Sequence, residues 1–373
     1  MSLASILALA VAILIPIGYL VWISKRDFFE TRKVYLVRIC FVWGMIAYAI
    51  VSIIQSNFIS YGLLTHDQVV RFSAPILEEL VKGAILLYLI RRADFTYFVD
   101  GAIYGFTVGI GFAIIENVGY VIANPSSALV LAFLRVLSTN LIHATASGSI
   151  GIALGLARFE RSNSARRQLT LLASVIVAMA LHMAFNALVN SDVPILVPIL
   201  VGCGGGAVVY FIMRRGLRIM KGWVDEELKS DASITSHEIS VVNQLETVDM
   251  ALAGFKERFG EQNAATAKEV ILAQAQMGIY KRSAEKQQDE KLRRSAEAQV
   301  DALRASMDEN RKKLGAYRML FLRNIFPEDA SALWSRLDAT LQERMTPKSE
   351  AGKGLWTSLD QRVTDSMPKG EGQ

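Results

Sequence analysis

The sequence contains little cysteine and little charge. Only Cys40 and Cys203 occur in 373 residues, and both lie in apolar runs, so the chain is not a small secreted fold held by disulfides. Charged residues make up 20% of the chain and hydrophobic residues 52%, which excludes a disordered chain and a single soluble domain. The H-E-x-x-H signature of zinc enzymes is also missing, so any metal site must combine side chains from different segments.

The charge that is present is distributed unevenly. Residues 1–221 contain 18 Lys and Arg and 10 Asp and Glu, a net charge of +8, whereas residues 222–373 contain 22 and 25, a net charge of −3. The basic residues of the first part follow the ends of apolar segments, which explains them without a nucleic-acid partner. We therefore predict a membrane domain over residues 1–221, a cytoplasmic tail over residues 222–373 and no binding of nucleic acid.

Seven apolar stretches are long enough to cross a bilayer core, which needs roughly 20 residues per helix. Lys and Arg fall in alternate connections, which places the N-terminus outside and the tail in the cytoplasm, and Arg135 is interpreted as the outer boundary of the fifth span. The sequence predicts an all-α, multi-pass transmembrane bundle of about seven spans, with glycines allowing close helix packing. The spans are predicted near residues 3–23, 35–55, 73–90, 98–121, 133–157, 169–189 and 193–213.

The tail shows a helical pattern over residues 264–323, where apolar residues recur at the helical period among charges. This pattern predicts an amphipathic helix or a weak coiled coil, through which the chain could bind a cytoplasmic partner or self-associate. Pro327 is expected to end it. A shorter helix is predicted over residues 329–344, and the last residues are expected to be disordered.

Ionisable and amide side chains occur inside four of the predicted spans. Such residues are costly in a membrane and indicate function by default. Counted along each helix, they lie at similar depths of roughly 7 to 15 Å below the outer surface, so we expect one cluster. Its members are Glu78, Glu79 and Lys82 in the third span, Glu116 and Asn117 in the fourth, His143 in the fifth, and His182 and Asn186 in the sixth.

This set of side chains suits hydrolysis. A carboxylate in a partly dry site can take a proton from water, and two histidines with a glutamate form a catalytic zinc set, for which Glu116, His143 and His182 are the candidates. Lys82 can lie beside either Glu78 or Glu79 on its helix. A metal-dependent mechanism and a metal-free mechanism both remain open, as do a proton- or ion-coupled transporter and a membrane scaffold that recruits a partner through its tail.

Four motifs follow one another in separate predicted spans. They are E-E-x-x-K at Glu78 to Lys82, F-x-x-x-E-N at Phe112 to Asn117, then His143, and H-x-x-x-N at His182 to Asn186. Together they resemble the PrsW-type intramembrane proteases, a family similar to the prenyl-protein (CAAX) endopeptidases and their bacterial relatives. The prenyl-protein enzymes usually carry Arg in the first motif and His in the second, where this chain has Lys82 and Glu116, which favours the PrsW type.

The resemblance implies a membrane-embedded endopeptidase of the bacterial inner membrane. Its substrate would be a membrane protein, such as an anti-sigma factor, cut near the outer face. Carried over by position, Glu78 and Glu79 would activate the water, and Glu116, His143 and His182 would complete the site. Lys82, Asn117 and Asn186 would support it, with zinc as the possible metal.

Overall fold

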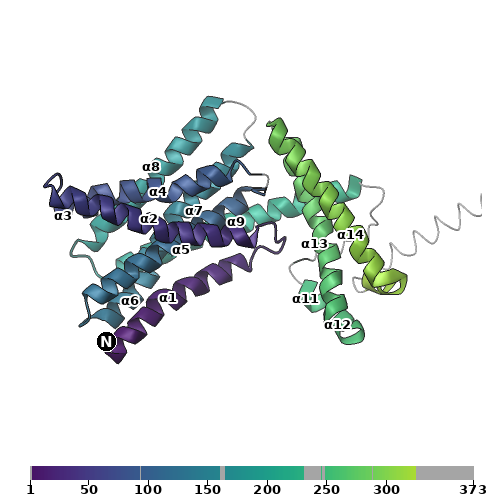
Figure 1. The fold of residues 1–373 in the computed structure, drawn as a ribbon, viewed down its shortest axis with the longest axis horizontal. Helices are drawn as coiled ribbons and strands as arrows, with labels where there is room; N and C mark the ends of the chain where they lie inside the picture. The colour runs from purple at the N-terminus through teal and green to yellow at the C-terminus, as the bar shows by residue number, and fades with distance from the viewer. Residues whose placement is uncertain are drawn as a thin grey trace, which may run out of the picture. The chain divides into compact units, whose positions relative to one another are not determined.

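The computed structural model describes residues 2–92, 94–159, 164–230, 245, 248–287 and 289–324. All regular secondary structure in these residues is helical (Figure 1), which confirms the predicted all-α class. Residues 1–326 form one compact unit. The helix predicted over residues 329–344 and the predicted disordered end lie outside the described residues.

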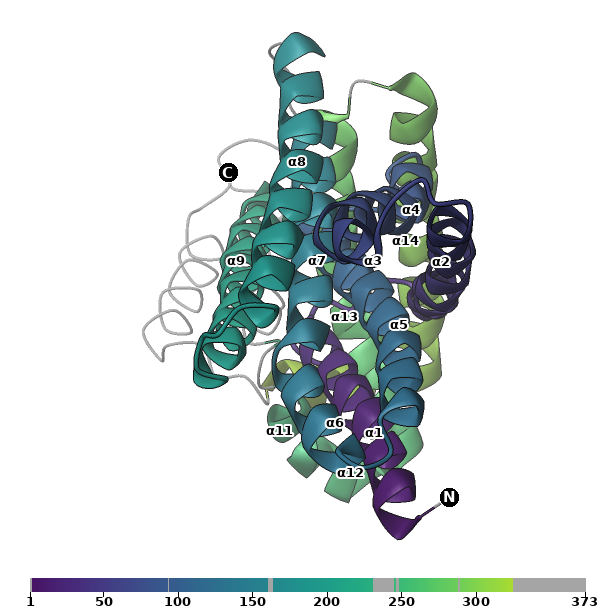
Figure 2. The ribbon, with the colours of Figure 1, turned by 90° about the vertical axis from the view of Figure 1, so that its left-hand side faces the viewer.

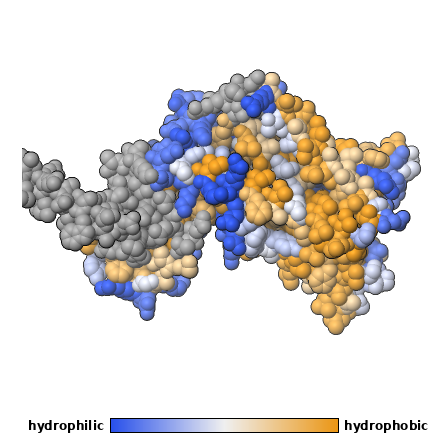
Figure 3. Space-filling view, turned by 180° about the vertical axis from the view of Figure 1, so that it is seen from behind, coloured by the Kyte–Doolittle hydropathy of each residue, from blue (hydrophilic) through white to orange (hydrophobic). Residues whose placement is uncertain are grey.

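Six helical segments of the described chain are long and apolar enough to cross a membrane, by length and composition. Large hydrophobic side chains are exposed along them, and hydrophobic residues cover much of the bundle surface in the space-filling view (Figure 3). This surface is expected where helices face lipid. The six are α1 (Leu3–Ser24), α2 (Val34–Ser60), α5 (Phe98–Ala123), the consecutive pair α6 (Ala128–Leu137) and α7 (Thr139–Arg158), α8 (Ser164–Val189) and α9 (Leu196–Ser230).

The third predicted span differs from the others. Its counterpart, α4 (Ala74–Leu89), has only 16 residues and is not among the six. It continues directly from α3 (His66–Gln68) and the π-helical turn η1 (Val69–Ser73). Helix α4 packs among α2, α7 and α8 and buries its charged residues inside the protein, whereas Leu80, Leu87 and Tyr88 remain exposed. Short π-helical turns are frequent beside functional sites.

The fifth predicted span is broken. Helices α6 and α7 meet at Ser138, whose φ of −121° and ψ of −82° are not helical. The Ser138 hydroxyl donates a hydrogen bond to the Leu134 carbonyl, 2.6 Å away, and so satisfies an end of α6. The span predicted near residues 133–157 lies within the apolar segment Ala128–Arg158, which consists of two consecutive helices. The apolar residues on both sides of Ser138 concealed this break in the sequence.

Helices α5 and α7 lie side by side at the centre of the bundle (Figures 1 and 2). Glycines make this close approach possible, as expected. A side chain at Gly105 would collide with the Ser147 backbone, and one at Gly109 would collide with the His143 backbone. The contact at Gly109 holds α7 against α5 at His143, whose side chain contacts Glu116 farther along α5.

The tail contains a helical hairpin. After α11 (Val248–Ala251) and α12 (Ala253–Phe259), helix α13 (Glu261–Lys286) turns back into α14 (Glu290–Asn324). The single long helix predicted over residues 264–323 is therefore two packed helices. Asp289 begins the second helix, because its Oδ1 accepts hydrogen bonds from the backbone nitrogens of Lys291 (2.9 Å) and Leu292 (3.2 Å).

Helix α13 also packs against the membrane part of the chain. Tyr280 and Ile279 are buried in the same apolar cluster as Val99 of α5 and Trp223 of α9. The Gln276 amide donates a hydrogen bond to the carbonyl of Phe29 at 2.9 Å, in the connection between α1 and α2. The first part of the tail thus shares a hydrophobic core with the bundle.

Candidate active site

Glu78 of α4 lies at the centre of the polar cluster. Its Oε2 is buried and accepts no hydrogen bond among the described residues. This oxygen lies 3.8 Å from His143 Nδ1 and 3.8 Å from His182 Nε2. A buried carboxylate oxygen without a donor is costly, and its position between two imidazoles points to a missing positive ligand.

His182 is oriented by a second carboxylate. Its Nδ1 lies 3.0 Å from Glu79 Oε1, and a carboxylate accepts, so Nδ1 carries the proton. The lone pair of Nε2 is therefore directed toward the side of Glu78. This carboxylate, imidazole and open lone pair follow the arrangement that orients histidine ligands in metal sites.

His143 repeats the arrangement from the other side of the cluster. Its Nε2 donates to Glu116 Oε2 at 2.9 Å, which leaves the lone pair on Nδ1. In this structure the ammonium of Lys82 donates to that lone pair at 3.0 Å. The two imidazole rings lie 4.6 Å apart and nearly perpendicular, at 86°.

Glu78, His143 and His182 fit a divalent cation. One ligand atom from each lies within 4.8 Å of the others, and all three residues are buried. One carboxylate and two imidazoles are the ligands of a common class of catalytic zinc site. The orphaned oxygen of Glu78 and the open lone pair of His182 Nε2 are the features that a cation would satisfy. At His143 Nδ1 the ammonium of Lys82 supplies the positive charge in this structure.

The structure places Glu78, not Glu116, in the candidate ligand set. Glu116 instead forms an ion pair with Arg135 at 2.6 Å and contacts the far nitrogen of His143. Arg135 was interpreted as the outer boundary of a span, but its side chain is only 11% exposed and belongs to this cluster. The sequence signal that could have revealed it is a lone arginine inside an otherwise apolar stretch.

Glu79 uses both of its oxygens within the protein. Oε1 accepts from Lys82 at 2.5 Å and from His182 at 3.0 Å, and Oε2 accepts from Ser147 at 3.3 Å. The side chain is completely buried. Glu79 is therefore placed to orient its neighbours, whereas Glu78 is placed to receive a ligand.

The three amides extend the network. Asn117 donates to Asn140 Oδ1 at 2.8 Å and accepts from Arg135 at 2.7 Å, which ties α5, α6 and α7 together. Asn186 donates to the carbonyl of Val70 at 3.0 Å, within the π-helical turn that precedes α4. These contacts hold the helices that carry the charged residues.

A cavity of about 550 Å³ reaches the cluster. Glu78, Glu116 and Arg135 line it, as do His66 of α3 and Val193, which lies in the connection between α8 and α9. This volume can admit water and part of a polypeptide. The catalytic candidates thus have a path to the end of the bundle that carries α3.

The membrane part of the chain matches a known family. Residues 32–213 match the model of the PrsW family of intramembrane metalloproteases. Protease PrsW of Bacillus subtilis is 29% identical over 177 residues, which are 47% of this chain and 79% of that protein. Protease PrsW of Geobacillus kaustophilus is 28% identical over 173 residues, 46% of this chain and 74% of that protein.

A third relative, Protease PrsW of Oceanobacillus iheyensis, is 31% identical over 134 residues, 35% of this chain and 60% of that protein. No solved structure is significantly similar to the chain. The matched residues contain all four motifs and every residue of the cluster. Over residues 32–213 the chain is therefore similar to the PrsW family of intramembrane metalloproteases, and this similarity supports an integral-membrane protease.

Proposed function

We propose that the protein hydrolyses a peptide bond of a membrane-protein substrate, with Glu78, His143 and His182 as the ligands of a divalent cation. The observation that supports this most is the orphaned Oε2 of Glu78, which lies 3.8 Å from one nitrogen of each imidazole. Glu79 and Glu116 orient the two histidines by accepting hydrogen bonds from His182 Nδ1 and His143 Nε2, the ring nitrogens that are not assigned to the cation. Such second contacts are typical of metal sites that work on substrates.

Zinc is the cation that this ligand set favours, and when bound it supplies an activated water and polarises the scissile carbonyl. Glu116 lines the cavity, so we assign it the uptake of the proton from the attacking water. Glu78 keeps its oxygen for the cation. Glu79, expected from the sequence to share in water activation, acts instead through His182 and Lys82.

The substrate is proposed to be a single-span membrane protein of the anti-sigma-factor class. The cavity leads from the cluster toward α3, at the end of the bundle that the distribution of Lys and Arg predicts to be outside. The cut would then fall near the outer face of a bacterial inner membrane. A distant relation to the prenyl-protein endopeptidases is likewise a proposal, supported by the order of the four motifs.

The test combines cleavage with metal content. A tagged candidate anti-sigma factor is co-expressed with the full chain, and its fragments are followed by immunoblot. The purified protein is assayed for zinc by mass spectrometry. We expect cleavage and about one zinc per chain, both lost in His143→Gln and His182→Gln. The matched control is His66→Gln, which changes another histidine that lines the same cavity.

An active preparation without bound metal would exclude the metal assignment. Unchanged cleavage in both histidine variants would exclude the site. The break at Ser138 is one feature that favours a carrier, because transporters bind ions at interrupted helices. A carrier or a scaffold would leave the co-expressed substrate intact, so the same immunoblot separates these functions from proteolysis.

A further inference from the structure

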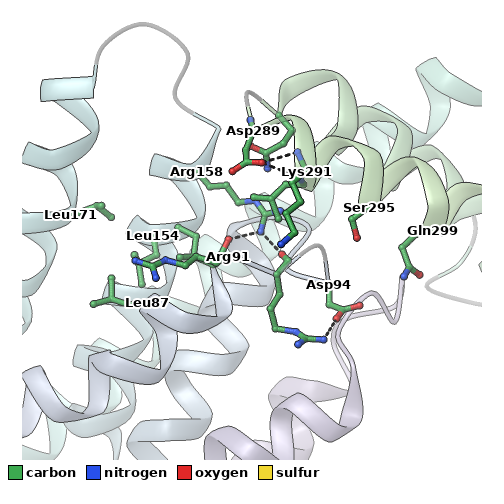
Figure 4. A pocket seen from close by; sticks show the side chains of 14 residues that line it. Leu87, Arg91, Asp94, Leu154, Arg158, Leu171, Asp289, Lys291, Ser295 and Gln299 are labelled. Carbon is green, nitrogen blue, oxygen red and sulfur yellow. Dashed lines mark hydrogen bonds and ion pairs between the residues drawn. The ribbon is translucent and has the colours of Figure 1, made fainter.

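A second and larger cavity, of about 800 Å³, lies far from the candidate active site. It forms where α4 and α7 end and where the turn between α13 and α14 approaches them (Figure 4). One part of its wall is apolar and another part is polar. Leu87, Leu154 and Leu171 come from three helices of the bundle, whereas Ser295 and Gln299 come from α14.

The cavity wall carries more positive charge than its acidic residues offset. Four basic residues and two acidic residues line it, and both acids are already engaged. Asp94 pairs with Arg92 at 2.8 Å, and Asp289 caps the first turn of α14. Asp289 keeps its negative charge beside Arg91, Arg158 and Lys291, so the cavity wall has a net formal charge of +2.

Two of these cations do not stabilise the described part of the fold through their side chains. The side chains of Arg91 and Lys291 form no hydrogen bond or ion pair among the described residues, and both residues are exposed. Arg158 is buried and donates to the carbonyls of Ile90 (2.8 Å) and Arg92 (2.7 Å), which fixes the end of α4. All three line the cavity, and in Figure 4 Lys291 lies beside Arg158 while the Arg91 side chain extends toward Leu154.

We propose that this cavity binds one anionic phospholipid of the adjacent leaflet. The phosphate would lie between Arg91 and Lys291, and the acyl chains would follow Leu87 and Leu171 toward the bilayer. Basic pockets between membrane helices at this boundary suit anionic headgroups, and the apolar wall suits the chains. A soluble phosphate would use only the first of these surfaces, which is why a lipid is the better occupant.

Such a lipid would join two distant parts of the sequence. Arg91 follows α4, the helix that carries Glu78 and Glu79, and Lys291 lies in the first turn of α14. The lipid headgroup would therefore couple the hairpin of the tail to the helix that holds the candidate active site. Lipid composition would then influence the tail's attachment without contact with the active site.

The experiment uses the full chain purified in a mild non-ionic detergent. Phosphatidylglycerol and phosphatidylcholine with the same acyl chains are added in turn, and bound lipid is counted by native mass spectrometry. We expect one phosphatidylglycerol per chain and much weaker binding of phosphatidylcholine. The double variant Arg91→Gln/Lys291→Gln should weaken phosphatidylglycerol binding roughly 10- to 30-fold, because two cations near the phosphate are lost.

The matched control is Arg215→Gln/Arg218→Gln, which removes the same charge from exposed positions of α9 outside the cavity and should bind as the wild type does. Leu171→Trp provides an independent variant, since it fills the apolar side, keeps the charges and should also reduce lipid binding. Equal binding of the two lipids, or equal loss in the control, would overturn the proposal. Displacement of the lipid by millimolar inorganic phosphate would show a soluble-anion site and overturn it as well.

Discussion

Two buried carboxylates of the bundle have opposite surroundings. Asp100, near the start of α5, accepts hydrogen bonds from the Thr31 hydroxyl at 2.9 Å, the Thr96 hydroxyl at 2.5 Å and the Thr96 backbone nitrogen at 2.7 Å. Glu78 has an oxygen that accepts none, although it faces three nitrogens within 4.0 Å. Both residues are costly to bury. The difference indicates that Asp100 holds the start of α5 to neighbouring segments, and it supports the proposed role of Glu78 as a metal ligand.

Replacing each of these carboxylates by its amide tests the comparison most strongly. Glu78→Gln removes a proposed metal ligand, so substrate cleavage should fall at least about 1000-fold while the protein still accumulates in the membrane. Asp100→Asn should do the reverse, with lower accumulation and normal cleavage per folded molecule. Immunoblots of substrate and enzyme measure both quantities. Normal cleavage by Glu78→Gln would remove the basis of the comparison.

Asp27, in the connection between α1 and α2, differs from Asp100, because its Oδ1 is buried without a hydrogen-bond partner among the described residues. Burial, and then the charge of Asp100, raise the pKa of Asp27 to about 6, although Arg32 opposes the shift. A raised pKa means that the folded state holds this proton more tightly than the unfolded chain. The resulting stabilisation is complete below about pH 4 and is lost as the pH rises through 6.

Asp27→Asn should therefore flatten the dependence of stability on pH. Relative to this variant, the wild type is expected to lose about 3 kcal/mol of stability between pH 4 and pH 7.5. Melting temperatures of the purified proteins in detergent across this range provide the measurement. The control is Asp67→Asn, at a side chain that is 69% exposed, which should follow the wild type. Parallel curves for Asp27→Asn and the wild type would contradict the assignment.

Glu79 combines features of both carboxylates. Both of its oxygens accept hydrogen bonds, as those of Asp100 do, but one of its donors is His182, a proposed metal ligand. Glu79→Gln keeps the shape of the side chain and weakens its hold on His182. We expect zinc affinity to fall about 10- to 100-fold, as for other residues that orient a metal ligand. Competition with a chromophoric chelator measures this affinity. An unchanged affinity would place Glu79 with Asp100 as a purely structural residue.

The smallest effect is expected at Thr31, a hydrogen-bond donor to Asp100. Thr31→Val removes one of the donors to Asp100 and should cost about 1 to 3 kcal/mol of stability, because the carboxylate remains buried. Cleavage per folded molecule should not change. Thr107→Val is the control, since its hydroxyl donates only to the Ile103 carbonyl of its own helix. A similar loss in both variants would mean that the bond to Asp100 has no special value.

The position of the cluster could be predicted from the sequence because helix rise converts residue number into depth. Which carboxylate faces the histidines could not be predicted, since that depends on the rotation of α4 and α5 about their axes. Glu116 was therefore preferred to Glu78 as a metal ligand. Arg135 was missed for the same reason, because its partner lies on another helix.

The sequence pattern also did not predict where the helices are interrupted. Apolar periodicity continues through Ser138, and the charged periodicity of the tail continues through Asp289, yet both positions end one helix and start another. A local side-chain hydrogen bond accompanies each break, at the Ser138 hydroxyl and at the Asp289 carboxylate, and the periodicity of apolar residues does not reveal it. Helix α4, the counterpart of the third predicted span, has only 16 residues and continues from α3 and the π-helical turn η1.

Lys82 has a consequence for how the enzyme matures. Its ammonium lies 2.5 Å from Glu79 and 3.0 Å from His143, and the residue has no exposed surface. With Arg135 it leaves the three glutamates, Glu78, Glu79 and Glu116, with a formal charge of only −1. The charged side chains of the cluster therefore nearly balance one another without a cation, so the helices can pack together in the bilayer whether or not the proposed metal is bound.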